Sequence, residues 1–418
     1  MKKRIRRILK HKLIGGSFVL MAGTFIGGAS NYLYHLLMGR MLGPTDYGVL
    51  ASLISLTYLL AVPMGALGLA IVKFVSAFRG EKKFEKVGIL FRSTTKKLLP
   101  FSFLFLLVLS VFSPFIVSFL HLNSVLPFLI IVMTSFVGIF STVNGAILQG
   151  LLRFGYVTAI GVLEMGLKLI VGVLLVVLGF KVNGALFGLL IGAIITYFLS
   201  FYPLRSLPSI EKEKDFRSKP IIAFILPVFF SILSFTSLYT IDIVLARHFL
   251  TAEEAGFYSA LANLGKIIFF VSGPVISVMF PLISERYASG KSYYPLLLAS
   301  LGLVAVICLI VTGVYFLLPE LMVEMLYGSA YLAVAAYLGL FGIFISFYSL
   351  SFLLNRFYLS IGRVKMVGLP VLAAVIQMIL ILILHRSIKE IIFISIIINA
   401  ALFLSEGIFL FYGKERTN

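Results

Sequence analysis

The sequence predicts an all-α protein that crosses a membrane many times, and three observations support this fold class. Hydrophobic residues make up 61% of the 418 residues and charged residues only 12%, about half the share in a soluble domain. The apolar residues gather in twelve stretches, most of them long enough to span a bilayer as a helix, which takes roughly 20 residues. Lysine and arginine concentrate in alternate gaps between these stretches.

The twelve predicted transmembrane helices follow one another along the whole chain. The first apolar run exceeds the usual core of a signal peptide, so we interpret it as a membrane helix rather than a cleaved leader. The predicted helices cover residues 13–38, 47–75, 98–120, 126–149, 157–179, 184–203, 220–245, 256–283, 295–318, 331–354, 366–384 and 390–412.

The distribution of positive charge predicts the orientation of these helices. The N-terminal tail and the alternate gaps after it hold 27 of the 35 lysines and arginines. Positive loops stay on the cytoplasmic side during membrane insertion, so both termini are expected in the cytoplasm and the protein in the cell membrane. The net charge of +19 therefore reflects loops next to anionic lipid headgroups rather than a nucleic-acid surface.

The gaps are too short to hold a folded domain, which excludes many activities. Two longer gaps lie on the predicted cytoplasmic side. Residues 76–97 could form a basic amphipathic helix on the lipid headgroups, and residues 204–219 look like a flexible connector. The sequence contains no P-loop pattern for nucleotide. The single Cys308 and the scattered histidines exclude a disulfide and indicate no metal site, so we expect no cofactor.

The two halves of the chain repeat the same design. The gaps at 39–48 and 246–256 each carry an arginine, then an acidic residue, then a glycine that opens the next helix. Pro63 and Pro274 interrupt the following helices at comparable depth. Six is an even number of spans, so the repeat is parallel, with a six-helix lobe at 1–203, a connector at 204–219 and a second six-helix lobe at 220–418. Two such lobes would enclose a central cleft and could rock to open it to either side.

Several short motifs resemble one family of transporters. The motifs are 39–53, its counterpart 247–261, Glu285–Gly290 and Leu326–Tyr331. Together they are similar to the polysaccharide biosynthesis or export family, which contains lipid-linked oligosaccharide flippases of the multidrug/oligosaccharidyl-lipid/polysaccharide superfamily. The resemblance implies a two-lobed, twelve-helix fold that moves a polyprenyl- or dolichyl-linked sugar to the outer leaflet. Peptidoglycan-precursor flippases usually carry two further helices, so the surface-polysaccharide branch is favoured.

Charged and amide side chains inside the predicted spans are the candidates for binding a sugar–pyrophosphate headgroup, because charges at membrane depth are costly. Lys168 lies near the middle of the fifth span, with Glu164 one turn earlier on the same face. This pair is either part of a cavity or a self-neutralising ion pair. Lys266, on the eighth span, shares a face with Asn263 and either lines the cavity or is tethered to Asp242.

A second group of candidates would form a gate or couple transport to an ion. Arg40 and Arg247 occupy equivalent positions at the outer ends of the first and seventh spans, where they either anchor to headgroups or pair with Asp46 and Glu254. The remaining candidates are Lys73 as a headgroup anchor or first phosphate contact, Glu406 as a proton site or paired carboxylate, and Asn144 and Gln149 as sugar-binding or helix-packing amides.

The sequence thus favours a non-enzymatic flippase for lipid-linked oligosaccharide that works by alternating access as a monomer, with H⁺ or Na⁺ as the candidate coupling ion. The alternative is a cation-coupled multidrug exporter, which would need fewer cavity cations and more carboxylates and aromatic residues. A membrane enzyme acting on the same lipid would need a large outer loop or a carboxylate–metal motif, and neither is present. Membrane lipids are the other expected partners, and nucleic acid is not.

Overall fold

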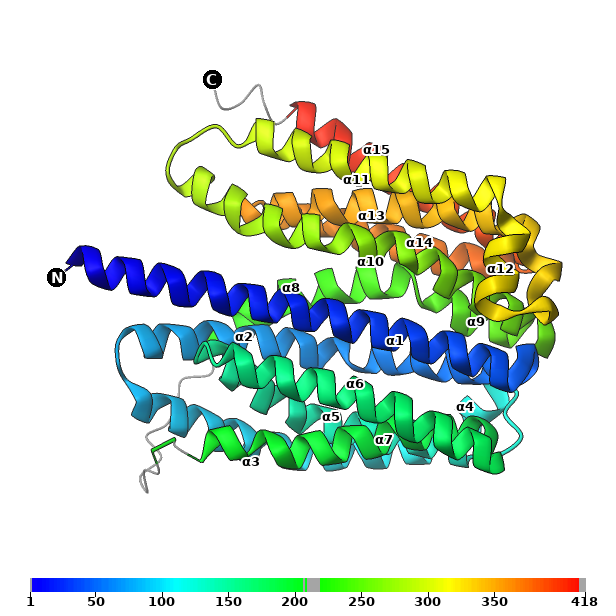
Figure 1. Cartoon of the computed structure of the whole chain (residues 1–418), viewed down its shortest axis with the longest axis horizontal. Coiled ribbons are helices and arrows are strands. Elements are labelled where there is room, and N and C mark those ends of the chain that lie inside the picture. The colour runs from blue at the N-terminus through cyan, green and yellow to red at the C-terminus, as the bar shows by residue number, and fades with distance from the viewer. Residues whose placement is uncertain (1, 206, 209–218, 413–418) are drawn as a thin grey trace. The chain divides into compact units, whose positions relative to one another are not determined.

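The computed structural model describes residues 2–205, 207–208 and 219–412, and within these residues the protein is helical without any strand (Figure 1). Each of the twelve predicted apolar stretches is occupied by helix. Nine helices in the described part of the chain are long and apolar enough to cross a membrane, or ten if a bent pair counts as one span. The prediction of an all-helical membrane protein is therefore confirmed.

The first half of the chain begins with a long helix that contains a break and continues through eight shorter helical elements. They are α1 (Lys2–Leu60), α2 (Val62–Gly80), α3 (Phe84–Val111), α4 (Ser113–Phe119), α5 (Leu126–Gly150), α6 (Phe154–Leu175), η1 (Val176–Phe180), α7 (Lys181–Ser200) and η2 (Tyr202–Leu204).

The second half opens on the bent pair α8 and α9, whose axes differ by 44°. Its elements are α8 (Lys219–Leu238), α9 (Ile241–Phe249), α10 (Ala252–Ala288), α11 (Tyr294–Leu317), α12 (Pro319–Tyr327), η3 (Ser329–Tyr337), α13 (Leu338–Ser360), η4 (Val364–Val367), α14 (Gly368–Ile383) and α15 (Ile388–Tyr412).

The break in α1 replaces the eight-residue gap predicted after the first span. Gly43 has a φ of 72° and a ψ of 173°, which interrupts the helix at a single residue, and Pro44 follows it directly. Glycine adopts positive φ without a steric penalty, and proline fits the first turn of a helix because it lacks an N–H. Two adjacent residues thus end one helix and begin the next.

The predicted surface helix at 76–97 is not present as a separate element. Helix α2 continues to Gly80, a three-residue turn with Lys82 at a φ of 58° follows, and α3 starts at Phe84 and continues without a break into the apolar segment. Lys86, Arg92, Lys96 and Lys97 therefore lie in the N-terminal half of α3, whereas Arg79 lies in the last turn of α2 and Lys82 and Lys83 lie in the turn between the helices. The helix passes Pro100 without ending.

The chain divides into two compact units, one of residues 1–38 and 60–229, the other of residues 39–59 and 230–418. In the first unit α5 packs against α2, α3, α6 and α7, and in the second α13 packs against α10, α11 and α15. Both central helices are the fourth of six in the predicted halves. The lobe boundaries stay a prediction, and most of the predicted connector, residues 206 and 209–218, lies outside the described residues.

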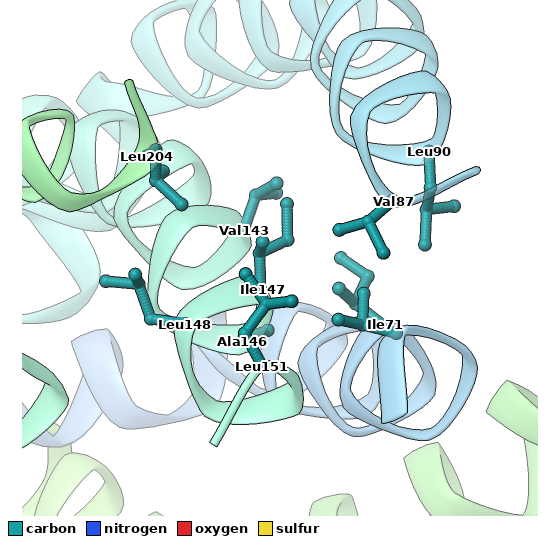
Figure 2. Close-up of a cluster of buried hydrophobic side chains, with 10 residues drawn as sticks. Ile71, Val87, Leu90, Val143, Ala146, Ile147, Leu148, Leu151 and Leu204 are labelled. Carbon is teal, nitrogen blue, oxygen red and sulfur yellow. The ribbon is translucent and has the colours of Figure 1, made fainter. Parts of the chain in front are cut away.

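One end of the first unit is filled by a cluster of aliphatic side chains (Figure 2). The cluster joins α2, α3, α5 and η2, and because it is closed to water it fixes these elements against one another. Its buried members are Ile71, Val75, Val87, Leu90, Val143, Ala146, Ile147, Leu148, Leu151 and Leu204.

Candidate functional site

Lys168 is buried in the first unit, on the apolar helix α6, with 7% of its surface exposed. Its ammonium donates a hydrogen bond of 2.7 Å to Oδ1 of Asn31 on α1. The same ammonium lies 4.1 Å from the centre of the Tyr34 ring, one helical turn further along α1. An amide oxygen and an aromatic face both attract a cation without neutralising it.

Small residues on α7 allow the backbone around Lys168 to be packed tightly. A Cβ atom added to Gly188 would lie 2.6 Å from the Gly172 nitrogen and 2.8 Å from the Lys168 oxygen. Gly192 lies similarly close to the backbone of Glu164. Gly184, Gly188 and Gly192 recur at every fourth residue of α7, and this small-xxx-small spacing brings α6 and α7 close together.

Tyr34 on α1 connects Lys168 on α6 to a third helix, α7. Its hydroxyl donates a 3.0 Å hydrogen bond to the carbonyl of Ala185 on α7, while its ring contacts the ammonium of Lys168. Glu164 lies one turn before Lys168 and acts on it electrostatically, but the two make no direct ion pair. The site thus has α1, α6 and α7 converging on one cation.

Lys266 is the corresponding buried cation of the second unit, with 8% of its surface exposed. Its ammonium lies 5.1 Å from the centre of the Tyr239 ring. This ring belongs to an aromatic cluster that joins α8, α10 and α13, consisting of Phe235, Tyr239, Phe269, Tyr348 and Phe352. Lys266 therefore lies at the edge of an aromatic surface.

Asp242 is fully buried on α9, and its carboxylate is held by groups other than Lys266. The Tyr258 hydroxyl donates to Oδ2 at 2.7 Å, and the backbone N–H of Ile243 donates to Oδ1 at 3.0 Å. Asp242 acts on Lys266 electrostatically, but the structure contains no direct ion pair between these two side chains. The predicted tether is thus an indirect one.

Asn263 lies one turn before Lys266, where its side chain is used in packing. Its amide donates to the Tyr47 hydroxyl at 2.6 Å and to the Ser259 carbonyl at 3.1 Å. The Tyr47 hydroxyl also lies 3.0 Å from that of Tyr327. Asn263 therefore connects α10 to residues 39–59, which belong to the same compact unit.

The four candidate gate residues do not form the two pairs considered from the sequence. The Arg40 guanidinium donates to the carbonyls of Glu324, Met325 and Leu326 at the end of α12. A cation at this position is favoured by the free carbonyls and the dipole of the helix. Arg40 thus holds a helix end.

The other gate candidates also have specific roles in the second unit. Arg247 is buried, and its electrostatic partner is Asp46. Glu254 accepts from the N–H and the hydroxyl of Thr251, and Thr251 in turn accepts from the N–H of Glu254. This reciprocal capping box begins α10. Arg247 and Asp46 are brought together, whereas Glu254 serves the helix start.

The remaining candidates are Asn144, Gln149, Lys73 and Glu406. Asn144 on α5 donates to the Ser200 hydroxyl on α7 at 2.6 Å, a contact between helices. Gln149 lies half-buried near the end of α5, and Lys73 is exposed near the end of α2. Glu406 on α15 is fully buried, and neither carboxylate oxygen has a hydrogen-bond partner in the described part of the protein.

Sequence reasoning missed the aromatic partners of the lysines and one further cation. Arg356 on α13 lies 4.7 Å from the centre of the Phe352 ring, at the aromatic cluster described above. Position 356 comes just after the predicted span, so it was counted as a loop charge. Gln377 and Asn399 are also joined by a hydrogen bond of 3.2 Å, which connects α14 to α15.

Within the described residues there is no group of histidine, cysteine and acidic side chains that could hold a metal ion.

Comparison with protein families gives one match that covers most of the chain. The profile of a family described as polysaccharide biosynthesis proteins matches residues 37–336, more than two thirds of the sequence. Comparison with curated proteins finds no significant match.

Solved structures share the fold over nearly the whole length of the chain. An inward-facing multidrug resistance MATE family transporter of the MOP superfamily has a TM-score of 0.76 at 16% identity, covering 92% of this chain and 96% of its own. The lipid II flippase MurJ in an inward closed conformation has a TM-score of 0.75 at 15% identity, covering 95% and 87%.

A third structure has a similar extent of match. It is a MOP superfamily transporter from Pyrococcus furiosus, described as having a binding pocket of reverse polarity that suggests a different function. The TM-score is 0.67 at 17% identity, covering 94% of this chain and 95% of the other. At such identities the three comparisons establish the fold of these transporters.

Proposed function

This chain belongs to the polysaccharide biosynthesis protein family, and we propose from that premise that it is a flippase for a lipid-linked oligosaccharide. The substrate would be a sugar chain on a polyprenyl pyrophosphate, moved from the cytoplasmic to the outer leaflet for surface polysaccharide assembly. Translocation would proceed by alternating access of two six-helix lobes. The fold shared with a lipid flippase and with multidrug transporters supports this mode of action.

The observation that carries the proposal is the pair of buried lysines. The closest described partners of the two ammonium groups are neutral: an amide oxygen and a tyrosine ring for Lys168, and a tyrosine ring for Lys266. Each lysine has a carboxylate close enough to act on it electrostatically, but neither makes a direct ion pair. A charged group inside a membrane protein is costly and is usually functional. A pyrophosphate would supply negatively charged oxygens that accept hydrogen bonds directly from the ammonium groups.

Other side chains would serve the sugars and the lipid tail. The half-buried rings of Tyr239, Phe269 and Phe352 offer apolar faces beside Lys266, and Arg356 adds a second cation there. Amides such as Asn263 and Gln149 would contact sugar hydroxyls only if they changed their present partners or positions. Glu164 would balance part of the charge on Lys168 between cycles.

Twelve crossings with both termini in the cytoplasm complete the proposed topology. The apolar segment Phe154–Leu204 covers 51 residues, enough for two crossings, and it breaks at η1, where Gly179 has a φ of 91°. Cysteines introduced at Thr45 and Ser329, both exposed, should react with an impermeant thiol reagent from outside, and one at Lys83 should not. Asn123 is a better outer site than Leu122, which is buried. The opposite labelling pattern would invert the topology.

Asp242 and Glu406 are the carboxylates that would couple transport to H⁺ or Na⁺. Both are fully buried, and the oxygens of Glu406 have no partner among the described residues. Glu406→Gln should then weaken transport driven by an imposed ion gradient while leaving downhill exchange intact. If the wild type and Glu406→Gln transported at the same rate with and without the ion gradient, Glu406 would have no role in ion coupling.

The test of the flippase proposal is complementation of a strain that lacks its own flippase. Lys168→Ala and Lys266→Ala should each reduce surface polysaccharide by about tenfold or more, because each removes a charge-assisted bond to phosphate. Lys389→Ala is the control, since Lys389 is an exposed lysine in the first turn of α15. Full complementation by both variants at normal expression would contradict the proposal.

The alternative function is a cation-coupled multidrug exporter. The aromatic cluster of the second unit favours it, since cationic drugs bind aromatic faces, and so does the similar fold of a multidrug transporter. An exporter would raise resistance to cationic dyes, and removing Lys266 would improve that resistance by removing a like charge. Failure to complement polysaccharide synthesis together with dye resistance would support this alternative.

A further inference from the structure

A cavity of about 240 Å³ opens in the first compact unit between α3 and the chain that follows α7. One wall is the beginning of α3, and the other is formed by residues 201, 204, 205, 207 and 208, in and next to η2. The residues that line it are Gly88, Phe91, Arg92, Phe201, Leu204, Arg205, Leu207 and Pro208. This cavity is separate from Lys168, and the proposed transport function does not use it.

The walls of the cavity are fixed by packing on both sides. The aliphatic cluster of Figure 2 lies beneath it, since Leu90 and Leu204 belong to that cluster and Phe91 and Leu207 pack against it. Gly88 allows a close approach, because a Cβ at this position would lie 2.5 Å from the Pro208 carbonyl. The Arg153 guanidinium donates to the carbonyl of Pro203 and so holds the second wall.

Two arginines give the cavity its chemical character. Arg92 comes from α3 and Arg205 from the residue after η2, and both are exposed. The Arg205 guanidinium lies 5.5 Å from the centre of the Tyr202 ring, which orients it. None of the described residues lining the cavity is acidic. Guanidinium groups donate paired hydrogen bonds to phosphate oxygens, so two arginines beside apolar side chains suit a phosphate oxyanion chemically.

The size and the position of the cavity narrow the ligand further. A cavity of about 240 Å³ is smaller than the roughly 300–1,000 Å³ of a site for a whole drug-sized ligand, so it fits a headgroup and not a complete lipid-linked sugar. Arg92 and Arg205 both lie in gaps that the charge pattern assigns to the cytoplasmic side. Phosphate-bearing lipid headgroups occur at this depth.

We propose that this cavity binds the phosphate of an anionic lipid headgroup in the cytoplasmic leaflet. Arg92 and Arg205 hold the phosphate from opposite walls, and Phe91 and Phe201 contact the glycerol or first isoprene carbons. The same chemistry is available from the phosphodiester of a bulk phospholipid and from the pyrophosphate of a polyprenyl-linked sugar. The proposal concerns binding and does not depend on the flippase function.

The test uses the full-length protein in nanodiscs of phosphatidylcholine, to which phosphatidylglycerol or undecaprenyl pyrophosphate is added in separate arms. Retained lipid is counted by native mass spectrometry. The double variant Arg92→Gln/Arg205→Gln should bind the anionic probe about tenfold more weakly than the wild type, because it loses charge-assisted hydrogen bonds. Lys291→Gln, which removes an exposed positive charge of the second unit, should bind as the wild type does.

A variant that preserves charge separates recognition from general attraction. Arg92→Lys/Arg205→Lys keeps both charges but loses the planar forks, so we expect a loss smaller than that of the glutamine variant. If the glutamine variant melts at a lower temperature than the wild type in pure phosphatidylcholine, the binding test is made with the lysine variant instead.

Each outcome decides the proposal or the source of the ligand. If the double glutamine variant binds less phosphatidylglycerol than the wild type and the same amount of undecaprenyl pyrophosphate, the ligand is a bulk phospholipid. If it binds less undecaprenyl pyrophosphate only, the ligand is the carrier lipid. If it binds less of both, the cavity recognises phosphate in general. All three support the cavity as the site. Wild-type binding by the folded double variant would overturn the proposal, as would an equal loss in Lys291→Gln.

Discussion

The two buried lysines differ in how firmly their surroundings hold them. Lys168 makes a 2.7 Å hydrogen bond to Asn31 and lies 4.1 Å from the centre of the Tyr34 ring, while glycines hold its backbone against α7. Lys266 lies 5.1 Å from one ring at the edge of a half-buried aromatic surface, and its nearest carboxylate is bonded to Tyr258. The first lysine is fixed by geometry, and the second has more freedom to change partners.

In the proposed transport cycle, the two lysines would therefore have different roles. A rigid cation gives a fixed point for a phosphate, because little side-chain freedom remains to be lost on binding. A cation on an aromatic surface can follow a ligand as it moves. Three substitutions test the contrast, and they are described from the largest expected effect to the smallest.

The largest effect is expected from Gly188→Leu, which would separate α6 from α7. The new side chain would clash with backbone atoms at 2.6 to 2.8 Å, and overpacking of this kind costs about 3 kcal/mol. The melting temperature of the purified protein should fall accordingly. Gly161→Leu is the matched control on α6, because no atom lies within 4 Å of its added Cβ. Equal melting temperatures would mean that Lys168 is not held by this packing.

Tyr258→Phe should have an intermediate effect in the second unit. It removes the 2.7 Å hydrogen bond to the buried Asp242 carboxylate, and hydrogen bonds to charged groups contribute about 2 kcal/mol. The free energy of unfolding, measured by denaturation in detergent, should fall. Adding Asp242→Asn to this variant should partly restore the stability, because it removes the buried charge. Tyr156→Phe, at an exposed tyrosine, serves as the control. An unchanged stability would show that Asp242 depends on Lys266 after all.

The smallest effect is expected from Tyr34→Phe in the first unit. The ring and its contact with Lys168 remain, and the hydroxyl that donates to the Ala185 carbonyl is removed. Neutral hydrogen bonds between membrane helices contribute about 0.6 kcal/mol on average. Polysaccharide export should be nearly unchanged. If Tyr34→Phe lowered the free energy of unfolding by more than Tyr258→Phe does, the ranking of the two sites would be reversed.

The sequence predicted the helical membrane fold and the two buried lysines because these follow from composition and from charge within apolar runs. Gly184, Gly188 and Gly192 recur at every fourth residue, so their spacing alone places them on one helix face for close packing. The partners of the lysines did not follow from spacing, since Asn31 lies 137 residues from Lys168. Spacing rules report neighbours on one helix, whereas contacts between helices depend on tertiary packing.

Local backbone geometry set a second limit. The apolar pattern predicts a loop at Gly43–Pro44, although glycine and proline together can end one helix and start another within two residues. The charges of residues 76–97 predict a surface helix. From Phe84 on, this stretch continues into α3 without a break, since charged first turns of a span can lie in the headgroup region.

The only cysteine of the sequence, Cys308, has 4% of its surface exposed on α11, next to the Ser346 carbonyl. The chain also has no tryptophan. Engineered thiols can therefore carry spin labels or dyes without first replacing the native one, and a single introduced indole would fluoresce without background. The natural protein is already suited to following its own conformational cycle by spectroscopy.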